Sequence, residues 1–87
     1  VLLEKSSRME LKILGKTFDE ALPEIDRFID DSILVGMDKI RIVHGKGTGA
    51  LRSKVRSYLK QNKKIAEFYS PPPFAGGDGV TIAVIKE

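Results

Sequence analysis

The residues best suited to chemistry in this sequence form one short run, HGKGTG, at positions 44–49. Its three glycines let the backbone approach a bound group closely, because they carry no Cβ atom. His44 can transfer a proton near neutral pH, and Lys46 places a positive charge beside it. The combination fits an anion such as a phosphate group, with His44 as general acid or base and Lys46 stabilising the charge.

The neighbouring residues predict how this run is held. The β-branched stretch 40–43 predicts a strand before it. After it, apolar residues recur at helical spacing: Ala50, Leu51, Val55, Tyr58 and Leu59. We therefore expect strand, glycine-rich turn and helix, with Thr48 as the helix cap and an end near Asn62. The Gly47 and Gly49 amides and the positive end of the helix dipole would cradle phosphate oxygens. A plain tight turn is the simpler interpretation.

Charge is distributed unevenly along the chain, which has a net charge of +3. Residues 39–66 hold nine Lys or Arg and no Asp or Glu, whereas residues 17–31 hold six acidic residues and one basic residue. One stripe of the second predicted helix is basic: Arg52, Arg56, Lys60 and Lys63. A basic side around the glycine-rich turn would attract a phosphate backbone, although two solvated helix faces would give the same pattern.

Composition narrows the class of protein. The chain has 87 residues, 41% of them hydrophobic, and no cysteine, which suits one small domain without disulfides. No apolar run reaches the roughly 20 residues of a membrane helix, and no leader pattern indicates secretion. We expect a cytoplasmic protein with no membrane partner. Because the chain begins at Val1, we expect a part of a longer protein, with 1–8 as a linker or flexible arm and 9–87 as the domain.

The first half of the chain predicts a strand and a helix. Alternating residues 9–14 predict a short strand that ends at the following glycine. Thr17 and Glu20 form a capping box for a helix that Gly36 can end, and Pro23 predicts either a kink or a later start. The apolar stripe of this helix comprises Ala21, Leu22, Ile25, Phe28, Ile29 and Ile33.

Two further strands, 65–69 and 80–85, follow the second helix and flank a loop, SPPPFAGGDG, at 70–79. The last strand is nearly all apolar, which indicates a central position. With right-handed crossovers, the order β-α-β-α-β-β predicts an α/β (α+β) two-layer sandwich with a mixed four-stranded sheet. Its uncovered face would carry Lys12, Leu14, Arg41 and Val43. In the loop, Phe74 would either stack on an unpaired base or fold back on the core.

Three short motifs resemble the Smr (small MutS-related) family. The stretch 11–15, LKILG, stands where that family has Leu-Asp-Leu-His/Arg-Gly. The stretch 44–52, HGKGTGALR, resembles its second signature, and 76–81, GGDGVT, resembles its third. The resemblance covers roughly residues 9–87. It implies a mixed four-stranded sheet similar to the C-terminal domain of bacterial initiation factor three.

The resemblance also implies nucleic-acid binding and endonuclease activity, as nicking of DNA or, in eukaryotic relatives, cleavage of RNA. It implies attachment to a larger MutS-like ATPase chain, in a parent linked to suppression of homologous recombination and, in some lineages, to recognition of collided ribosomes. The expected partners are DNA, including branched DNA, and ribosomal RNA. Lys12 and Leu14 replace the family's acidic residue and its basic or imidazole residue, so a mechanism that uses that acid is not carried over.

These observations define the expected site. The predicted catalytic residues are His44 and Lys46, and a structural imidazole is the alternative for His44. The predicted nucleic-acid contacts are Gly45, Gly47, Thr48, Gly49, Arg52, Arg56, Lys60, Arg41, Lys12 and Gly77. No metal ligands are predicted, because Glu10 and Asp78 are the only carboxylates expected near the turn. The sequence is compatible with a Mg²⁺ or Mn²⁺ ion held mainly by water and phosphate.

The sequence is compatible with three functions. The first is a nicking endonuclease, in which the 2′-hydroxyl of RNA or an activated water would attack the phosphate. The second is a non-catalytic binding module that docks its parent onto ribosomal RNA or branched DNA. The third is a nucleotide-binding enzyme, but the P-loop order of glycine, four residues and Gly-Lys-Ser/Thr is not met.

Overall fold

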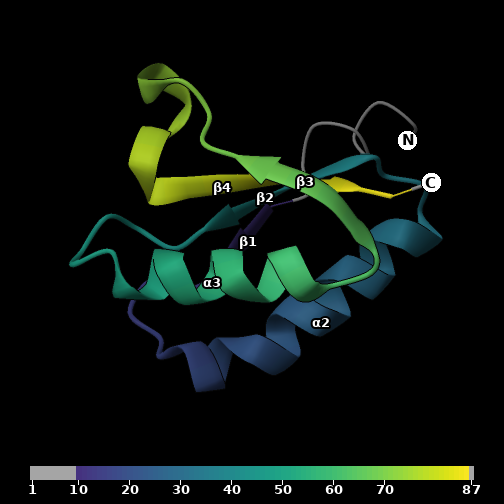
Figure 1. Ribbon diagram of the computed structural model, residues 1–87, viewed down its shortest axis with the longest axis horizontal. Coiled ribbons are helices and arrows are strands. Elements are labelled where there is room, and N and C mark those ends of the chain that lie inside the picture. Colours follow the sequence, from purple (N-terminus) through teal and green to yellow (C-terminus); the bar gives the residue numbers. More distant parts are fainter. Residues whose placement is uncertain (1–9, 87) are drawn as a thin grey trace.

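Strands and helices alternate along the chain in the predicted order. The computed structural model describes residues 10–86 (Figure 1), so the predicted linker 1–8, Met9 and Glu87 lie outside the described residues. The elements are β1 (Glu10–Lys12), α2 (Phe18–Leu34), β2 (Lys39–Val43), α3 (Ala50–Gln61), β3 (Ile65–Tyr69) and β4 (Val80–Ile85). Two short 3-10 turns, η1 (Pro73–Ala75) and η2 (Gly77–Gly79), lie between the last two strands.

The four strands form one mixed sheet in the order β1-β2-β4-β3. β1 runs parallel to β2, and β4 runs antiparallel to both of its neighbours. The predicted mixed sheet and the predicted central place of β4 are both confirmed. The apolar side chains of β4 explain its place, since a central strand is buried more fully than an edge strand.

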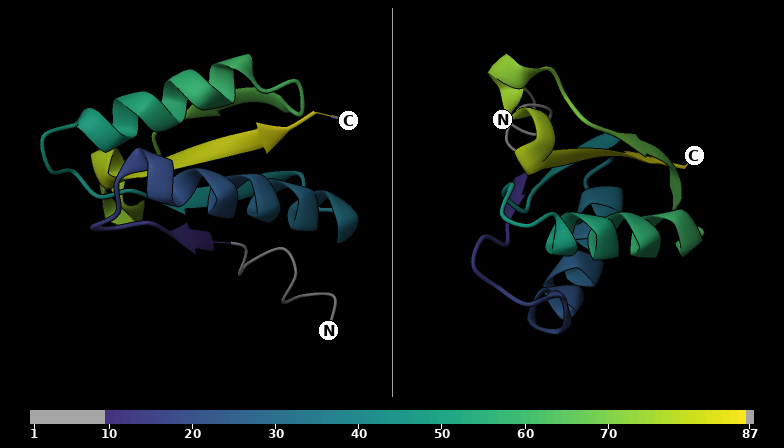
Figure 2. Two further views of the ribbon diagram at one scale, coloured as in Figure 1. Left: turned by 90° about the horizontal axis from the view of Figure 1, so that it is seen from below. Right: turned by 60° about the vertical axis from the view of Figure 1, so that its left-hand side comes forward.

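Both helices cover the same face of the sheet, which makes the fold a two-layer sandwich (Figures 1 and 2). The core lies between these layers. It comprises Ile13, Ala21, Ile25, Ile29, Met37, Ile40, Ile42, Val55, Leu59, Ile65, Ala83 and Ile85. On β2 and β4 these residues occupy alternate positions, and on α2 and α3 they recur at four-residue steps, which keeps them on one face of each element.

The predicted capping box begins α2. The Glu20 amide donates to the Thr17 hydroxyl at 3.2 Å, and the Thr17 amide donates to the Glu20 carboxylate at 2.9 Å. The helix then runs through Pro23, so the alternative of a later start is wrong. Pro23 lies on the exposed side, where the missing N–H is least costly. Gly36, with φ +80°, follows the C-cap as predicted.

One residue of the predicted apolar stripe of α2 is exposed. Ile33 is 40% exposed, whereas Ser32 is fully buried. Successive residues point about 100° apart on a helix, so the last turn of α2 presents Ser32 and not Ile33 to the core. The Ser32 hydroxyl donates to the Phe28 carbonyl at 2.7 Å, which satisfies it without a partner from the sheet.

The start of α3 differs from the prediction. The N-cap is Gly49, in the left-handed region with φ +85°, and not Thr48. The Thr48 hydroxyl instead accepts a 3.3 Å hydrogen bond from the Ala50 amide. A glycine adopts this conformation without steric cost, which lets the chain enter the helix directly from the turn. Within residues 10–86, no helix is long and apolar enough to cross a membrane.

Three connections gather at one end of the molecule (Figure 2). They are the link between β1 and α2, the glycine-rich turn 44–49 and the late loop 70–79. The parallel strands β1 and β2 both end there, and β4 begins there beside the end of β2. The fold therefore brings the motifs of the first, second and third parts of the chain to a single edge.

Candidate nucleic-acid interface

The glycine-rich turn uses its glycines for conformation. Gly45, Gly47 and Gly49 have φ values of +80°, +40° and +85°, which other residues adopt only under strain. The Gly49 amide donates to the Lys46 carbonyl at 3.0 Å and so closes the turn. A Cβ atom on Gly47 would meet nothing within 4 Å. The backbone at Gly47 is therefore open to a ligand, while the Gly49 amide is already engaged.

The late loop is docked directly on this turn. The His44 and Gly45 amides both donate to the Gly79 carbonyl, at 3.1 and 2.9 Å. A Cβ atom on Gly79 would lie 3.7 Å from the Lys46 side chain, so the stem of Lys46 passes over this glycine. The second and third motifs thus form one structural unit, in which the end of one loop fixes the start of the other.

His44 is buried, with 5% of its surface exposed, and both ring nitrogens have partners. Nδ1 lies 2.8 Å from the Gly45 carbonyl, so it must carry the proton and donate. Nε2 lies 2.8 Å from the Thr81 hydroxyl, which also accepts from Arg56 Nε at 3.0 Å. In a neutral ring that carries its proton on Nδ1, Nε2 is an acceptor, so Thr81 donates to it and the three residues form one hydrogen-bonded chain, His44–Thr81–Arg56.

Burial lowers the pKa of His44, and the nearby Arg56 and Arg52 charges lower it further, while the Gly45 hydrogen bond opposes them. Burial therefore favours the neutral ring, in which Nε2 accepts from the Thr81 hydroxyl. His44 fixes the Gly45 carbonyl in this conformation. To act as general acid or base, it must exchange one of these hydrogen bonds for one to the substrate.

The lowered pKa predicts a pH-dependent stability. The unfolded chain titrates His44 near the ordinary value of about 6.5, whereas the folded chain keeps the ring neutral to lower pH. Below about pH 6.5 the unfolded state binds more protons, so the free energy of unfolding falls with falling pH. We expect thermal unfolding at a lower temperature at about pH 5.5 than at about pH 7.5. His44→Gln should flatten this slope, because His44 is the chain's only histidine. Parallel slopes would contradict the assignment.

An open groove of about 550 Å³ runs beside α3, which we call the basic groove. Its lining comprises Arg52, Ser53, Arg56, Ser57, Lys60, Phe68, Ser70 and Asp78. The three predicted contacts of α3, Arg52, Arg56 and Lys60, are thus brought together. Lys63 lies beyond the helix end at Gln61, so the predicted helical stripe is shorter than expected.

Arg56 is not on a solvated helix face. Its Nη2 donates to the Ser70 hydroxyl at 2.6 Å, and its guanidinium carbon lies 5.8 Å from the centre of the Phe68 ring. Together with the Thr81 bond, these contacts fix the guanidinium at the floor of the basic groove. Arg52 is held less firmly than Arg56, since its Nη1 has only a 3.7 Å ion pair with the exposed Asp78 carboxylate.

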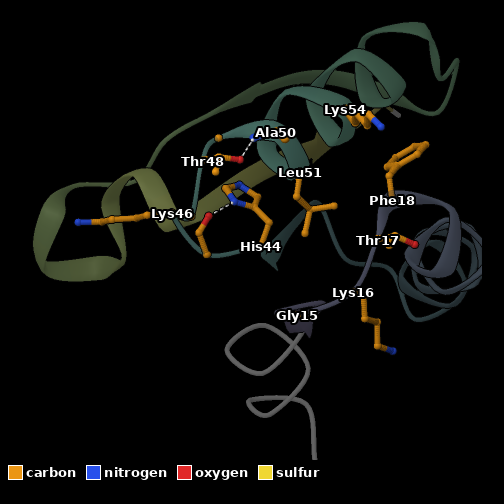
Figure 3. A pocket seen from close by; sticks show the side chains of 13 residues that line it. Gly15, Lys16, Thr17, Phe18, His44, Lys46, Thr48, Ala50, Leu51 and Lys54 are labelled. Atoms are coloured by element: carbon orange, nitrogen blue, oxygen red, sulfur yellow. Dashed lines mark hydrogen bonds between the residues drawn. The ribbon is translucent and has the colours of Figure 1, made fainter.

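A second hollow of about 380 Å³ lies on the other side of the turn, between residues 15–18 and the start of α3 (Figure 3). His44 lies beneath Thr48 and Ala50, and Lys46 points away from the hollow. Lys54 also lines it. The exposed Lys46 ammonium is therefore free to meet a ligand outside this hollow.

The remaining predicted contacts lie on the uncovered face of the sheet or in the late loop. Lys12 is exposed on β1. Arg41 is half-buried on β2, and its Nη2 donates to the Ala75 carbonyl at 3.0 Å, so it supports the late loop. Gly77 has φ +51° and open space around its Cα atom. Lys12 and Arg41 are not part of the basic groove, which lies on the helix side.

Sequence reasoning missed Thr81, which joins His44 to Arg56. The signal was present, since Thr81 is the one hydroxyl residue in the apolar strand VTIAVI. As for metals, residues 10–86 contain no group of three or more His, Asp or Glu side chains that could hold an ion. Glu10 is exposed on β1, and Asp78 faces Arg52.

The similarity of this chain to known proteins identifies its family. A family model described as the Smr domain matches residues 11–86. The chain belongs to the Smr domain family. A chain from Pediococcus pentosaceus named Endonuclease MutS2 is 53% identical over 76 residues, which cover 87% of this chain and 10% of that one. One of the same name from Streptococcus mutans is 42% identical over 83 residues, covering 95% and 11%. This Smr domain thus spans about a tenth of the length of the relatives it matches.

Solved structures confirm the fold. The crystal structure of the Smr domain of Thermus thermophilus MutS2 superposes with a TM-score of 0.87 at 38% identity, covering 91% of this chain and 99% of that one. YdaL, a stand-alone small MutS-related protein from Escherichia coli, superposes with a TM-score of 0.85 at 21% identity, which shows a shared fold. The predicted family and the predicted mixed α/β sandwich are both confirmed.

The first motif departs from the family pattern at Leu14, which the structure places against the glycine-rich turn. A Cβ atom on Gly45 would lie 2.4 Å from Leu14 Cδ2, so the Leu14 side chain packs against the glycine-rich turn. The family pattern has a basic or imidazole group at this position. In this Smr domain an apolar group therefore stands beside the turn instead.

Proposed function

We propose that this Smr domain binds nucleic acid through the basic groove and the glycine-rich turn, and that it nicks the phosphodiester backbone. One observation carries the proposal: Lys46, Arg52 and Arg56 lie around the two docked signature loops at one end of the fold. Positive charges next to an open backbone amide are the groups that bind a phosphate and stabilise charge on it.

Each group has a distinct role in this proposal. Arg56, held by Thr81 and Ser70, is a rigid phosphate contact. Lys46 and Arg52 stabilise the charge that develops on the attacked phosphate, and the open amide of Gly47 binds one of its oxygens. The nucleophile is the 2′-hydroxyl in RNA or a water molecule on DNA. As its oxygen bonds to phosphorus, the bond from phosphorus to the sugar oxygen of the neighbouring nucleotide breaks, and solvent takes the nucleophile's proton and protonates the leaving oxygen. A Mg²⁺ or Mn²⁺ ion bound through phosphate and water is compatible with these roles.

The parent protein is proposed from the relatives. Since they are named Endonuclease MutS2 and are about ten times as long as the matched region, we propose that this domain is attached to a larger MutS-like ATPase in the bacterial cytoplasm. Its substrates there would be DNA, including branched DNA, or ribosomal RNA, and the parent would act in suppression of homologous recombination.

A second function is favoured by two specific contacts. Both nitrogens of His44 are engaged inside the protein, and Leu14 packs against the turn. Neither group can move a proton to or from substrate in this arrangement. These contacts support a non-catalytic module that binds nucleic acid and docks the parent onto it.

A cleavage assay separates the two functions. Supercoiled plasmid and a structured RNA are incubated with the domain in EDTA, Mg²⁺ or Mn²⁺, beside His44→Ala, with folding checked by circular dichroism. Cleavage in EDTA that His44→Ala abolishes supports proton transfer by His44. Cleavage lost only in EDTA indicates an ion. Binding without cleavage in every arm establishes the docking module and refutes nicking.

Salt dependence tests the binding site itself. If Lys46 and Arg52 each neutralise a phosphate, the affinity for a duplex should fall steeply with salt, and Lys46→Ala or Arg52→Ala should each reduce the log–log slope by about 1. Lys39→Ala is the matched control, since Lys39 is exposed at the opposite end of β2 from the turn. Fluorescence anisotropy over a range of salt concentrations measures both quantities, and equal slopes for all four proteins would contradict this site.

A further inference from the structure

Phe74 is the most exposed large apolar residue of the described chain. Its side chain is 92% exposed, at the centre of η1 in the late loop. The sequence left two fates open for it, and folding back on the core is now excluded. An aromatic ring held in solvent adds little to the stability of the domain, and its apolar faces are open to a ligand.

The backbone that carries Phe74 is held in place by many constraints. Three consecutive prolines, Pro71–Pro73, restrict φ, and Pro71 is buried as an anchor. The Ala75 and Gly77 amides both donate to the Pro72 carbonyl, at 2.9 and 3.1 Å. Because the loop is already ordered, a ligand that contacts the ring pays little conformational entropy.

Three sets of contacts tie the backbone around Phe74 to the rest of the interface. Arg41 donates to the Ala75 carbonyl at 3.0 Å from the sheet below. Gly76 has φ +116°, and a Cβ atom there would lie 2.4 Å from Val80 Cγ2, so the loop folds tightly onto the start of β4. The far end of the loop, Gly79, accepts the two amide bonds from the glycine-rich turn. The late loop that carries Phe74 also contributes Ser70 and Asp78 to the lining of the basic groove, beside Arg52.

The chemistry of these neighbours identifies the ligand. An exposed aromatic ring on a loop that also lines a cationic groove is an arrangement suited to single strands, in which phosphates meet the charges and a base stacks on the ring. A base inside a duplex has both faces covered by its neighbours, so it cannot stack on a side chain. An apolar protein partner would gain from the ring but not from the charges.

We propose that Phe74 is a stacking platform for an unpaired nucleobase, in a strand whose phosphates lie in the basic groove. The inference rests on the proposed nucleic-acid binding and narrows its substrate class. The preferred ligand has a single-stranded stretch, as at an end, a gap or a branch, and blunt duplex is bound by charge alone.

The chain contains no tryptophan, so Phe74→Trp gives a single fluorescent reporter at the platform. Titration with a short oligothymidylate should quench its emission. A strand of abasic residues with the same number of phosphates should leave the emission unchanged, since it carries no base to stack. Equal quenching by both strands would overturn the proposal.

Affinity gives a second readout. Phe74→Ala should weaken binding of the oligothymidylate about tenfold and leave binding of blunt duplex within about twofold. Leu34→Ala is the matched control, because Leu34 is 83% exposed at the far end of α2. Unchanged oligothymidylate affinity in Phe74→Ala would refute stacking, as would an equal loss for duplex.

The failure of this inference is distinguishable from failure of the proposed function. If Lys46→Ala and Arg52→Ala weaken salt-dependent binding while Phe74→Ala does not, the interface stands and the platform is refuted. If the unaltered domain binds neither strand nor duplex in a salt-dependent way, the nucleic-acid function fails and the platform fails with it.

Discussion

Replacing Lys46 or Arg52 by alanine is expected to lower the rate of phosphodiester cleavage by about 10²- to 10³-fold. Both side chains are proposed to stabilise charge that develops in the transition state, where the loss of one fixed group is most costly. Lys46 is exposed, and Arg52 has only a 3.7 Å ion pair to Asp78, so both can turn to a bound phosphate without breaking a buried contact. Single-turnover nicking of supercoiled plasmid at saturating protein measures this rate.

Saturation separates catalysis from binding in this experiment. If the two residues only bind phosphate, added protein will restore the full rate, and the effect will appear in affinity alone. Lys39→Ala should cleave at the unaltered rate, since it removes the same charge at the other end of β2. A comparable loss in Lys39→Ala would show that net charge, and not the position of Lys46 and Arg52, governs the reaction.

Thr81→Val is expected to lower the free energy of unfolding by about 1–3 kcal/mol. Valine has nearly the same shape as threonine but cannot donate to His44 Nε2 or accept from Arg56 Nε. The imidazole nitrogen would then be buried without a partner, because Thr81 is fully buried and His44 is 5% exposed. Arg56 would keep its Ser70 and Phe68 contacts and lose the bond that fixes its depth in the basic groove.

Urea unfolding of Thr81→Val beside Thr81→Ser tests this chain of hydrogen bonds. Serine keeps the hydroxyl and removes one methyl group, which should cost about 0.8 kcal/mol. The valine variant should therefore be the less stable of the two, and it should also bind a duplex more weakly. Equal or greater stability of Thr81→Val than of Thr81→Ser would contradict the proposed role of the hydroxyl.

Most of the fold could be predicted from the sequence, because helix caps and the apolar periods of strands and helices involve only a few neighbouring residues. The capping box at Thr17 and Glu20, the alternation in β2 and the apolar run of β4 each express one backbone period or one cap. The predictions for Thr48 and Ile33 were wrong for a related reason. Gly49 can cap in a conformation closed to other residues, and which side chain of the last helical turn is buried depends on the neighbouring layer.

The sequence predicted single residues of the candidate site but not the contacts between them. The sequence indicated that Arg52, Arg56 and Lys60 share a helix face and that the motif at 44–49 suits an anion. It could not show that Arg56 is fixed by Thr81 and Ser70, since these residues come from other elements. The alternatives for His44 were a catalytic and a structural imidazole, and its hydrogen bonds favour the structural one in this conformation.

The sequence by itself therefore determined the order of the elements, the apolar faces that pack and the motifs that mark the Smr family. Each of these depends on residue types at short spacing along the chain. Tertiary structure alone decided that the late loop docks on the glycine-rich turn, that Thr81 links His44 to Arg56 and that Phe74 faces solvent. The hydrogen bonds of Thr81 join residues 37 and 25 positions apart, and the pairing of β2 with β4 and the packing of α3 bring these residues together.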